Sequence, residues 1–212
     1  MSKHYGSIAF TGDVRAVQSE HGSEAFYGRK LAAGKASSGR DPLTGEEKEY
    51  LSERDGLFLA SVGETGWPYV QFRGGPRGFV RVLDDHTIGW ADFRGNLQYI
   101  STGNVNGDDR VAIIAVDYAQ RRRLKIFGHA RIVTAEQDAA LIQSLSDSTY
   151  DAVVERAVVV GVDAYDWNCP QHITPRFTLE ELEPALAPLR SELSSLQAEN
   201  ARLREQLERA GA

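Results

Sequence analysis

Arginines are concentrated in the central part of this sequence and are its strongest candidates for chemistry. Residues 71–131 contain ten basic and six acidic side chains, a net charge of +4 within a chain whose overall charge is −6. Because a guanidinium group can direct two N–H groups onto phosphate oxygens, such a region is typical of a site for a phosphate-bearing ligand. A solvated face whose arginines pair with nearby aspartates explains the charge equally well.

Two glycine-containing turns could bring this basic region close to a ligand. The first, Arg73-Gly74-Gly75-Pro76-Arg77-Gly78, allows close approach of the backbone, but it matches neither a dinucleotide-binding fingerprint nor a P-loop. The second, Phe93-Arg94-Gly95-Asn96, follows a predicted strand that ends at Trp90-Ala91-Asp92. A helix predicted over 96–101 would then add its N-terminal N–H groups to the Arg94 and Asn96 side chains. Trp90 is interpreted as a core residue rather than a stacking platform.

The remaining reactive side chains show no catalytic or metal-binding pattern. Cys169 is the only cysteine, so it forms no internal disulfide, and packing is a better interpretation of it than a reactive thiol. His172 is interpreted as a structural residue. The spacing of His21, His86 and His129 offers no set of metal ligands.

Composition narrows the classes of protein further. A pI near 5.4 argues against a nucleic-acid-binding protein that acts through overall basicity. There is no run of 18 apolar residues, and Met1 is not followed by a signal-peptide pattern. We therefore expect a cytoplasmic protein without a membrane span.

The sequence divides into three predicted regions: an N-terminal extension with short helices over 1–43, a domain over 44–177, and a C-terminal helix over 178–212. The elements that position the arginines belong to the middle region. Within the domain we predict strands over 57–62, 69–73, 79–83, 87–91, 110–118 and 124–133, and one more over 158–162. Thr44 and Glu47 fit a capping box for a helix ending near Arg54, and Thr134 and Gln137 fit a second. This series is typical of an antiparallel barrel or sandwich.

The N-terminal extension gives weaker signals. Val14, Val17 and the pair Ala25-Phe26 could face a core from short helical turns, and residues 35–40 (KASSGR) are predicted to form a loop.

The C-terminal region carries a leucine pattern instead of basic charge. Apolar residues alternate at steps of three and four from Leu186 to Leu207, and Asn200 occupies an a position of the resulting heptads. A buried asparagine at a favours a parallel two-stranded coiled coil, in which Glu199 at g would pair with Arg204 at e of the partner. Because Pro184 and Pro188 are tolerated only near helix starts, we predict a continuous helix after Pro188.

The central region resembles a known family. The hairpin Gly66-Trp67-Pro68, the segment 87–96, and the late arginine-rich strand 121–128 are similar to the flavin-binding split barrel of the pyridoxamine 5'-phosphate oxidase superfamily. The segment from Trp167 to Arg176 resembles the C-terminal Trp-to-Arg segment of that superfamily. The resemblance spans roughly residues 41–177, and it is greatest to the branch of predicted flavin-nucleotide-binding proteins.

This resemblance implies a mainly β fold, a six- to seven-stranded antiparallel split barrel with flanking helices, and a homodimer that binds FMN at its interface. Arg94 and Asn96 would hold the phosphate, with Arg73 or Arg77 assisting. Two strands would line the ribityl chain and the flavin ring with Gln71, Phe72, Arg73, Trp90, Ala91 and Asp92. The partner subunit would contribute Arg122, Arg123 and Trp167.

Two departures from the family pattern limit what the resemblance implies. Oxidase members carry a lysine in a Ser-Arg-Lys or Ser-x-Lys turn, where this chain has Phe93-Arg94-Gly95-Asn96. Only His172 and Arg176 approximate the pyridoxal-site residues, so pyridoxamine phosphate is not the expected substrate. We therefore expect a flavin-dependent oxidoreductase acting on an unidentified small molecule, with NAD(P)H as one candidate donor. A flavin carrier or sensor without turnover, and a split barrel binding haem or a deazaflavin, are the alternatives.

Overall fold

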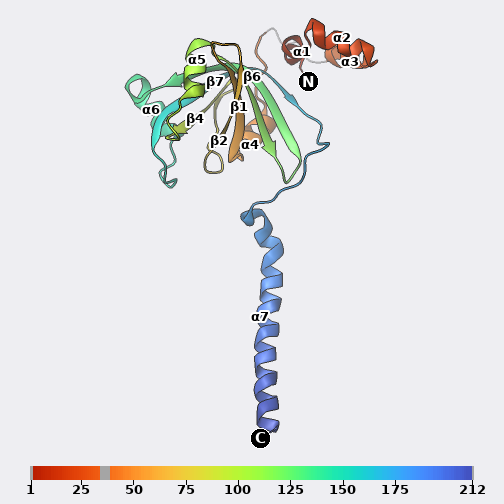
Figure 1. Ribbon diagram of the computed structural model, residues 1–212, viewed down its shortest axis with the longest axis vertical. Helices are drawn as coiled ribbons and strands as arrows, with labels where there is room; N and C mark the ends of the chain where they lie inside the picture. The colour runs from red at the N-terminus through yellow and green to blue at the C-terminus, as the bar shows by residue number, and fades with distance from the viewer. Residues whose placement is uncertain (1, 34–38, 212) are drawn as a thin grey trace. The chain divides into compact units, whose positions relative to one another are not determined.

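The computed structural model describes residues 2–33 and 39–211 and divides into two units. The larger unit, here called the body, comprises residues 1–117 and 121–171, and the second comprises residues 118–120 and 172–212. The strands of the body curve around one core (Figure 1). The second unit contains the long C-terminal helix and is described by itself below.

The body holds a seven-stranded antiparallel sheet in the order β2-β1-β5-β6-β7-β4-β3, which confirms a mainly β fold with flanking helices, consistent with a split barrel. The strands are β1 (Gly56–Val62), β2 (Pro68–Gly74), β3 (Arg81–Asp84), β4 (Thr87–Phe93), β5 (Arg110–Asp117), β6 (Arg122–Val133) and β7 (Val154–Trp167). The helices are α1 (Lys3–Ala9), α2 (Gly12–Glu20), α3 (Glu24–Ala33), α4 (Gly45–Ser52), α5 (Ile100–Gly107), α6 (Ala135–Leu145) and α7 (Leu179–Ala210).

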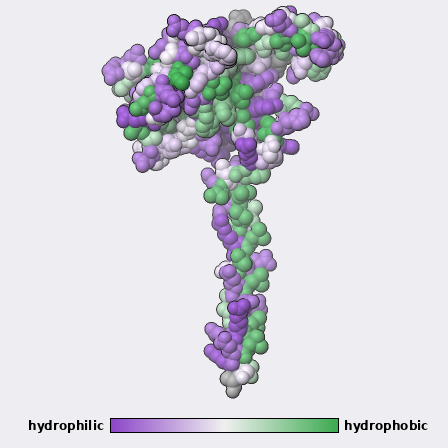
Figure 2. Space-filling model, viewed as in Figure 1, coloured by the Kyte–Doolittle hydropathy of each residue, from purple (hydrophilic) through white to green (hydrophobic). Residues whose placement is uncertain are grey.

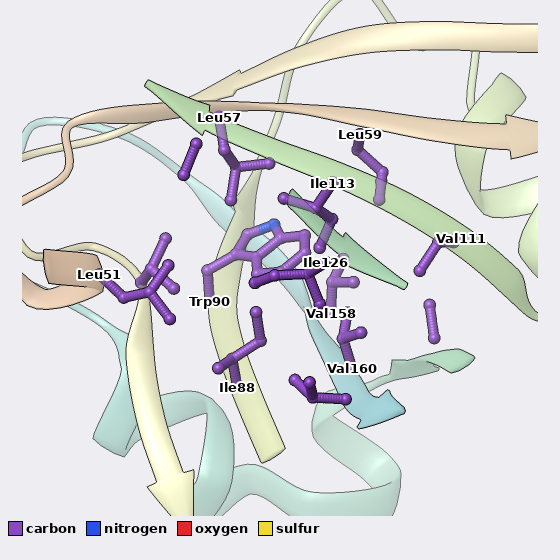
Figure 3. Close-up of a cluster of buried hydrophobic side chains, with 14 of the residues drawn as sticks. Leu51, Leu57, Leu59, Ile88, Trp90, Val111, Ile113, Ile126, Val158 and Val160 are labelled. Atoms are coloured by element: carbon purple, nitrogen blue, oxygen red, sulfur yellow. The ribbon is translucent and has the colours of Figure 1, made fainter. Parts of the chain in front are cut away.

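Alternation along the strands builds the core. Leu57 and Leu59 of β1 and Ile113 of β5 are almost fully buried on the inner face of the sheet. They surround the Trp90 indole, which is 1% exposed and lies among apolar side chains from several strands (Figure 3). Burying this much apolar surface is the main force that closes the strands around one another.

A second, smaller core lies on the other face of β4 and β7. Because successive strand residues point to opposite faces, Ala91, Ala157 and Val159 are buried against Leu145 of α6 rather than in the main core. Residues 157–160 of β7 are therefore all buried, since both faces of the strand are covered there.

The barrel is left open between β2 and β4. β2 lies at one end of the strand order, and β3 pairs with β4 only through the first three residues of β4, Thr87–Gly89. Within the described residues, the second half of β4 therefore pairs only with β7. An ion pair between Arg73 of β2 and Asp92 of β4 crosses this opening.

Several predicted elements are confirmed and others are corrected. The two predicted capping boxes are present at the starts of α4 and α6, and Thr178 and Glu181 form a third at the start of α7. The helix predicted over 96–101 is wrong: α5 begins at Ile100, because Leu97 and Tyr99 have φ values of 62° and 52°, which no helix tolerates. β7 begins at Val154 rather than at residue 158, and β3 begins at Arg81 rather than at residue 79.

The N-terminal extension also differs from the prediction. It forms three helices, but Val14, Val17 and Phe26 are exposed and do not face a core. Tyr5 of α1 is buried instead, stacked on Phe127 of β6 with ring centroids 5.2 Å apart. Most of the loop predicted over 35–40 lies outside the described residues.

α7 begins directly after Thr178 and includes both prolines, so a start after Pro188 is wrong. Among the helices in the described parts of the chain, none combines the length and apolar character needed to cross a membrane.

Candidate functional site

A polar pocket of about 190 Å³ lies at the open side of the barrel. β2 and β4 form two of its walls, the start of β7 forms a third, and the turn leading into α5 closes it. The lining residues are Tyr69, Gln71, Arg73, Asp92, Phe93, Gly95, Asn96, Leu97, Gln98, Tyr99, Ile100, Ser101, Thr102, Glu155 and Arg156.

A buried ionic cluster forms the inner wall of this pocket. Arg73 Nη1 lies 3.2 Å from Asp92 Oδ1, and Arg156 Nε lies 3.5 Å from Asp92 Oδ2. Asp92 is 7% exposed. Burial raises the pKa of the Asp92 carboxyl above its ordinary value, and the two guanidinium groups act in the opposite direction. These side chains lie on the same inner face of their strands as the core residues. The apolar core is therefore bordered by charged groups at this end of the barrel.

Three polar atoms around the pocket are buried without a hydrogen-bond partner among the described residues: Arg73 Nε, Arg156 Nε and Ser101 Oγ. Two of them belong to guanidinium groups, and Arg156 Nε, although it forms an ion pair with Asp92 Oδ2 at 3.5 Å, makes no hydrogen bond. Buried polar groups in native proteins are nearly always hydrogen-bonded, to protein, water or a ligand. All three atoms belong to residues that line the pocket, where a bound ligand would be close enough to supply an acceptor after a small side-chain movement.

Glu155 holds the outer part of the cluster together. Arg94 Nε donates to Glu155 Oε1 at 2.9 Å, and Arg156 Nη2 donates to Glu155 Oε2. The hydrogen bond from Arg94 is the main reason that the pKa of Glu155 is lowered. The Arg156 guanidinium lies over the Tyr99 ring, 4.6 Å from its centroid, which further restricts its position.

The pocket favours an anion. The lining itself is neutral, because Arg73 and Arg156 balance Asp92 and Glu155, and Arg94, which pairs with Glu155 from outside the lining, brings the cluster to a net charge of +1. Ile100, Ser101 and Thr102 lie at the N-terminus of α5, where free N–H groups point out of the helix. The side chain of the N-cap residue Tyr99 makes no hydrogen bond to these N–H groups. The arrangement suits an oxyanion that accepts several hydrogen bonds at once.

The structure brings four of the predicted site residues into this pocket: Gln71, Arg73, Asp92 and Asn96. Asn96 supports the turn, because its side-chain oxygen accepts a hydrogen bond from the backbone N–H of Gln98 at 3.2 Å.

Five other predicted residues from these strands and turns lie elsewhere. The Trp90 side chain is enclosed in the main core, which agrees with its interpretation as a core residue, and the Ala91 side chain faces α6. Phe72 points to the outer face of β2, where its ring packs against Phe58. Arg77 pairs with Glu53 and is 58% exposed, whereas Arg94 borders the pocket only through its ion pair with Glu155.

The three residues predicted to reach the site from a partner subunit lie away from the pocket within their own chain. The Trp167 indole donates to Glu47 Oε1 at 2.6 Å, and the Arg122 guanidinium lies 4.3 Å from the Trp167 ring centroid. Arg123 donates to the backbone oxygen of Cys169 at 3.2 Å. None of these three side chains lines the described pocket of its own chain.

Sequence reasoning missed Arg156, Tyr99 and Ser101. Arg156 pairs in register with Asp92, but the strand was predicted to begin two residues later. Residues 154–157 (Val-Glu-Arg-Ala) show no alternation of apolar and polar side chains, so the sequence carries no clear signal for the earlier start. Tyr99 and Ser101 were placed inside a helix predicted over 96–101, which the structure does not form.

Among the residues that the structure describes, no group of three or more His, Cys, Asp or Glu side chains could hold a metal ion.

Comparisons with known proteins match the part of the chain that contains the sheet. The family model described as pyridoxamine 5'-phosphate oxidase matches residues 43–167, which include every strand of the sheet. No curated protein matches the chain.

Several solved structures are similar. HupZ of Group A Streptococcus is 19% identical over 64% of this chain and 99% of its own, with a TM-score of 0.44. A Clostridium acetobutylicum protein related to general stress protein 26 is 14% identical over 65% and 94%, with a TM-score of 0.44. HutZ, described as the haem storage protein of Vibrio cholerae, is 16% identical over 59% and 94%, with a TM-score of 0.38. On the match of the family model, the chain belongs to the pyridoxamine 5'-phosphate oxidase family.

Proposed function

We propose that this protein binds FMN in the pocket between β2, β4 and α5, and that Arg73 and Arg156 take the phosphate. The observation that carries the proposal is the set of three buried polar atoms without a hydrogen bond, Arg73 Nε, Arg156 Nε and Ser101 Oγ, all in residues that line the pocket. A phosphate monoester offers three acceptor oxygens, which suits paired guanidinium groups and a helix N-terminus. Family membership makes a flavin nucleotide the first candidate for such a phosphate.

The size of the pocket supports a homodimer. Pockets that enclose a ligand of cofactor size usually measure about 300–1,000 Å³, whereas one chain offers about 190 Å³ here. The phosphate and part of the ribityl chain would fit, with Gln71 and Asn96 beside them. A second copy would enclose the flavin ring, with Arg122, Arg123 and Trp167 of the partner subunit as the proposed contacts.

The residues of this chain would bind and orient the cofactor. Asp92 fixes the two guanidinium groups from behind, so that little reorganisation is needed when an anion arrives. Glu155 and Tyr99 hold Arg156 from the outer side. When bound, FMN would supply hydride or electron transfer, and we propose an oxidoreductase that acts on a small molecule with NAD(P)H as a candidate donor. No side chain of the pocket is assigned as an acid or base.

FMN is preferred to haem on the chemistry of the lining. Haem iron needs an axial ligand such as His, Cys, Met or Tyr, and no His, Cys or Met is among the lining residues that the structure describes. Tyr69 and Tyr99 do line it, but Tyr69 donates to Gln71 and Tyr99 lies against Arg156. The paired guanidinium groups of Arg73 and Arg156 instead suit a phosphate.

The absorption spectrum of the purified protein and a titration with FMN test this proposal. We expect the two visible bands of oxidised flavin, or quenching of FMN fluorescence when FMN is added to colourless protein. Arg73→Gln and Arg156→Gln should each weaken FMN binding by roughly 1 to 3 kcal/mol, about 5- to 150-fold in Kd, because each loses a charge-assisted hydrogen bond.

Arg77→Gln is the matched control, since Arg77 is an exposed arginine of the same segment whose partner is Glu53. Melting temperatures measured without FMN separate a loss of binding from a loss of folding. Equal FMN affinities of the Arg73 and Arg77 variants would show that the phosphate binds elsewhere. A haem or deazaflavin absorption spectrum would show that the cofactor is not FMN. Consumption of NAD(P)H by the FMN-loaded protein, with oxygen or a quinone as acceptor, then distinguishes an enzyme from a flavin carrier.

A further inference from the structure

α7 presents one continuous apolar seam along its whole length. Within its 32 residues, the a and d positions of the heptads extend beyond the range predicted from sequence, in both directions. These positions hold Leu179, Leu182, Leu186, Leu189, Leu193, Leu196, Asn200, Leu203, Leu207 and Ala210. Apolar side chains gather on one side of the helix (Figure 2), where Leu193 is 56% and Leu207 72% exposed. Exposed leucines at this spacing need a partner.

The two prolines do not interrupt this seam. Pro184 falls at an f position and Pro188 at a c position, so both lie on the outer side of the helix, away from the a and d residues. Each removes one backbone N–H from the helical ladder, and the resulting free carbonyls also face away from the seam. The capping box of Thr178 and Glu181 secures the first turn ahead of them. The seam therefore spans more than four heptads rather than three.

The charges that flank the seam favour a parallel orientation of the partner. From residue 190 onward, the e positions hold Arg190, Gln197 and Arg204, and the g positions hold Glu192, Glu199 and Gln206. In a parallel pair, each g residue faces an e residue of the other helix, which brings Glu199 to Arg204. In the antiparallel pair that brings residue 179 opposite residue 210, e faces e and g faces g, so Glu192 would face Glu199, although Glu183 at the remaining e position would face Arg204.

Asn200 fixes the register of such a pair. It is the only polar residue at the a and d positions of α7, and Leu196, Gln197, Ala201 and Arg204 form a shallow hollow with it on the helix surface. A buried asparagine amide is satisfied when it meets a second asparagine amide across the seam. A parallel pair in register places Asn200 opposite Asn200, whereas other registers and partners leave it unpaired among leucines.

We propose that α7 pairs with α7 of a second copy of this chain in a parallel, in-register, two-stranded coiled coil. The partner is another copy because one helix supplies both complementary charges and the asparagine. The proposal does not depend on flavin binding, and a failure of one leaves the other standing. At about 1.5 Å per residue, the paired helices would extend for roughly 48 Å.

Disulfide crosslinking of the full-length protein tests the proposal. In a Cys169→Ser background, Ala210→Cys places a thiol at a d position and Ala198→Cys places one at an outward f position. Because d residues meet across the seam, mild oxidation of the Ala210→Cys variant should give a covalent dimer in high yield, at least tenfold faster than the Ala198→Cys control. Ala198 makes a good control, since it involves the same substitution in the same helix.

A mixture of Leu179→Cys and Ala210→Cys chains detects the antiparallel alternative, because only that orientation brings positions 179 and 210 together. Preferential heterodimers in this mixture would overturn the proposal. Crosslinking of Ala198→Cys as fast as Ala210→Cys, or no crosslinking of either variant, would also overturn it.

Discussion

Glu47 is the side chain that links the helix before the sheet to the last strand. It is buried, and its carboxylate accepts hydrogen bonds from the Thr44 backbone N–H at 3.0 Å, the Trp167 indole at 2.6 Å and the Tyr165 hydroxyl at 3.2 Å. Burial by itself raises the pKa of Glu47, but the hydrogen bonds from Thr44 and Trp167 outweigh it, and the pKa is lowered. One carboxylate thus caps α4 and fixes β7.

Glu47→Gln should destabilise the body by about 1–3 kcal/mol at pH 7, because strong charge-assisted hydrogen bonds become neutral ones. The pKa of Glu47 is lower in the folded state, so its contribution is complete above the ordinary value of 4.5 and is lost as the pH falls through the lowered pKa. The difference between wild type and variant should therefore shrink below about pH 4.5.

Urea unfolding at pH 7 and at a series of acidic pH values measures this difference. Glu49→Gln is the control, since Glu49 is exposed on the same helix and should show no such dependence. A difference that stays constant with pH would show that the Glu47 contacts do not depend on its charge.

Among the elements, the longest pairing in the sheet, between β6 and β7, depends on a glycine. The register shifts between Phe127 and Gly128, and a Cβ atom at Gly128 would lie 2.4 Å from the Gly161 backbone oxygen. Such an approach is possible only without a side chain. Neither strand can move away, because β6 and β7 also carry the inner residues of the core.

Gly128→Ala should therefore destabilise the body by about 2–4 kcal/mol, through the strain of separating two paired strands. Gly103→Ala is the control, because it lies in α5 with no atom within 4 Å of its added Cβ, and there alanine should be neutral or stabilise by up to about 1 kcal/mol. Thermal unfolding of both variants checks this pair of opposite effects. Equal melting temperatures would mean that the strand pair adjusts freely.

Elements set by local interactions could be predicted from the sequence. The capping boxes at Thr44 and Thr134 involve residues three positions apart, and the strands carry clear alternation, so their existence followed directly. The start of α5 did not, because Tyr99 in its left-handed conformation lies against Arg156 from a distant strand.

The candidate site likewise contains residues that the sequence could identify and residues that only the fold reveals. Arg73 and Asp92 were recognised from composition and family resemblance, but their ion pair joins two strands that are not neighbours in the sheet. Arg156, the second arginine on Asp92, could be found only once the strand register was known. Conversely, Arg77 has the right type and position in sequence but turns toward Glu53.

For the whole molecule, the two proposed associations support each other. A parallel coiled coil holds the N-terminal ends of two α7 helices side by side, so that the two bodies connect to the same end of the paired helices. The proposed flavin site needs two bodies to enclose the cofactor. A tail that keeps two bodies together replaces a bimolecular association by an intramolecular one, with an effective concentration in the millimolar range for a short connection.

Removal of residues 178–212 should therefore change how FMN binding depends on protein concentration. At high protein concentration, the truncated chain should bind FMN as a dimer with the affinity of the full chain, because every proposed contact lies before Phe177. On dilution it should dissociate and lose FMN, while the full chain retains it. Full-length Ala198→Glu, changed only on the outer face of α7, should behave as wild type. Sedimentation and FMN fluorescence measured over the same dilution series check this, and a truncated chain that stays dimeric and flavin-loaded at every concentration would show that the tail contributes nothing to the flavin site.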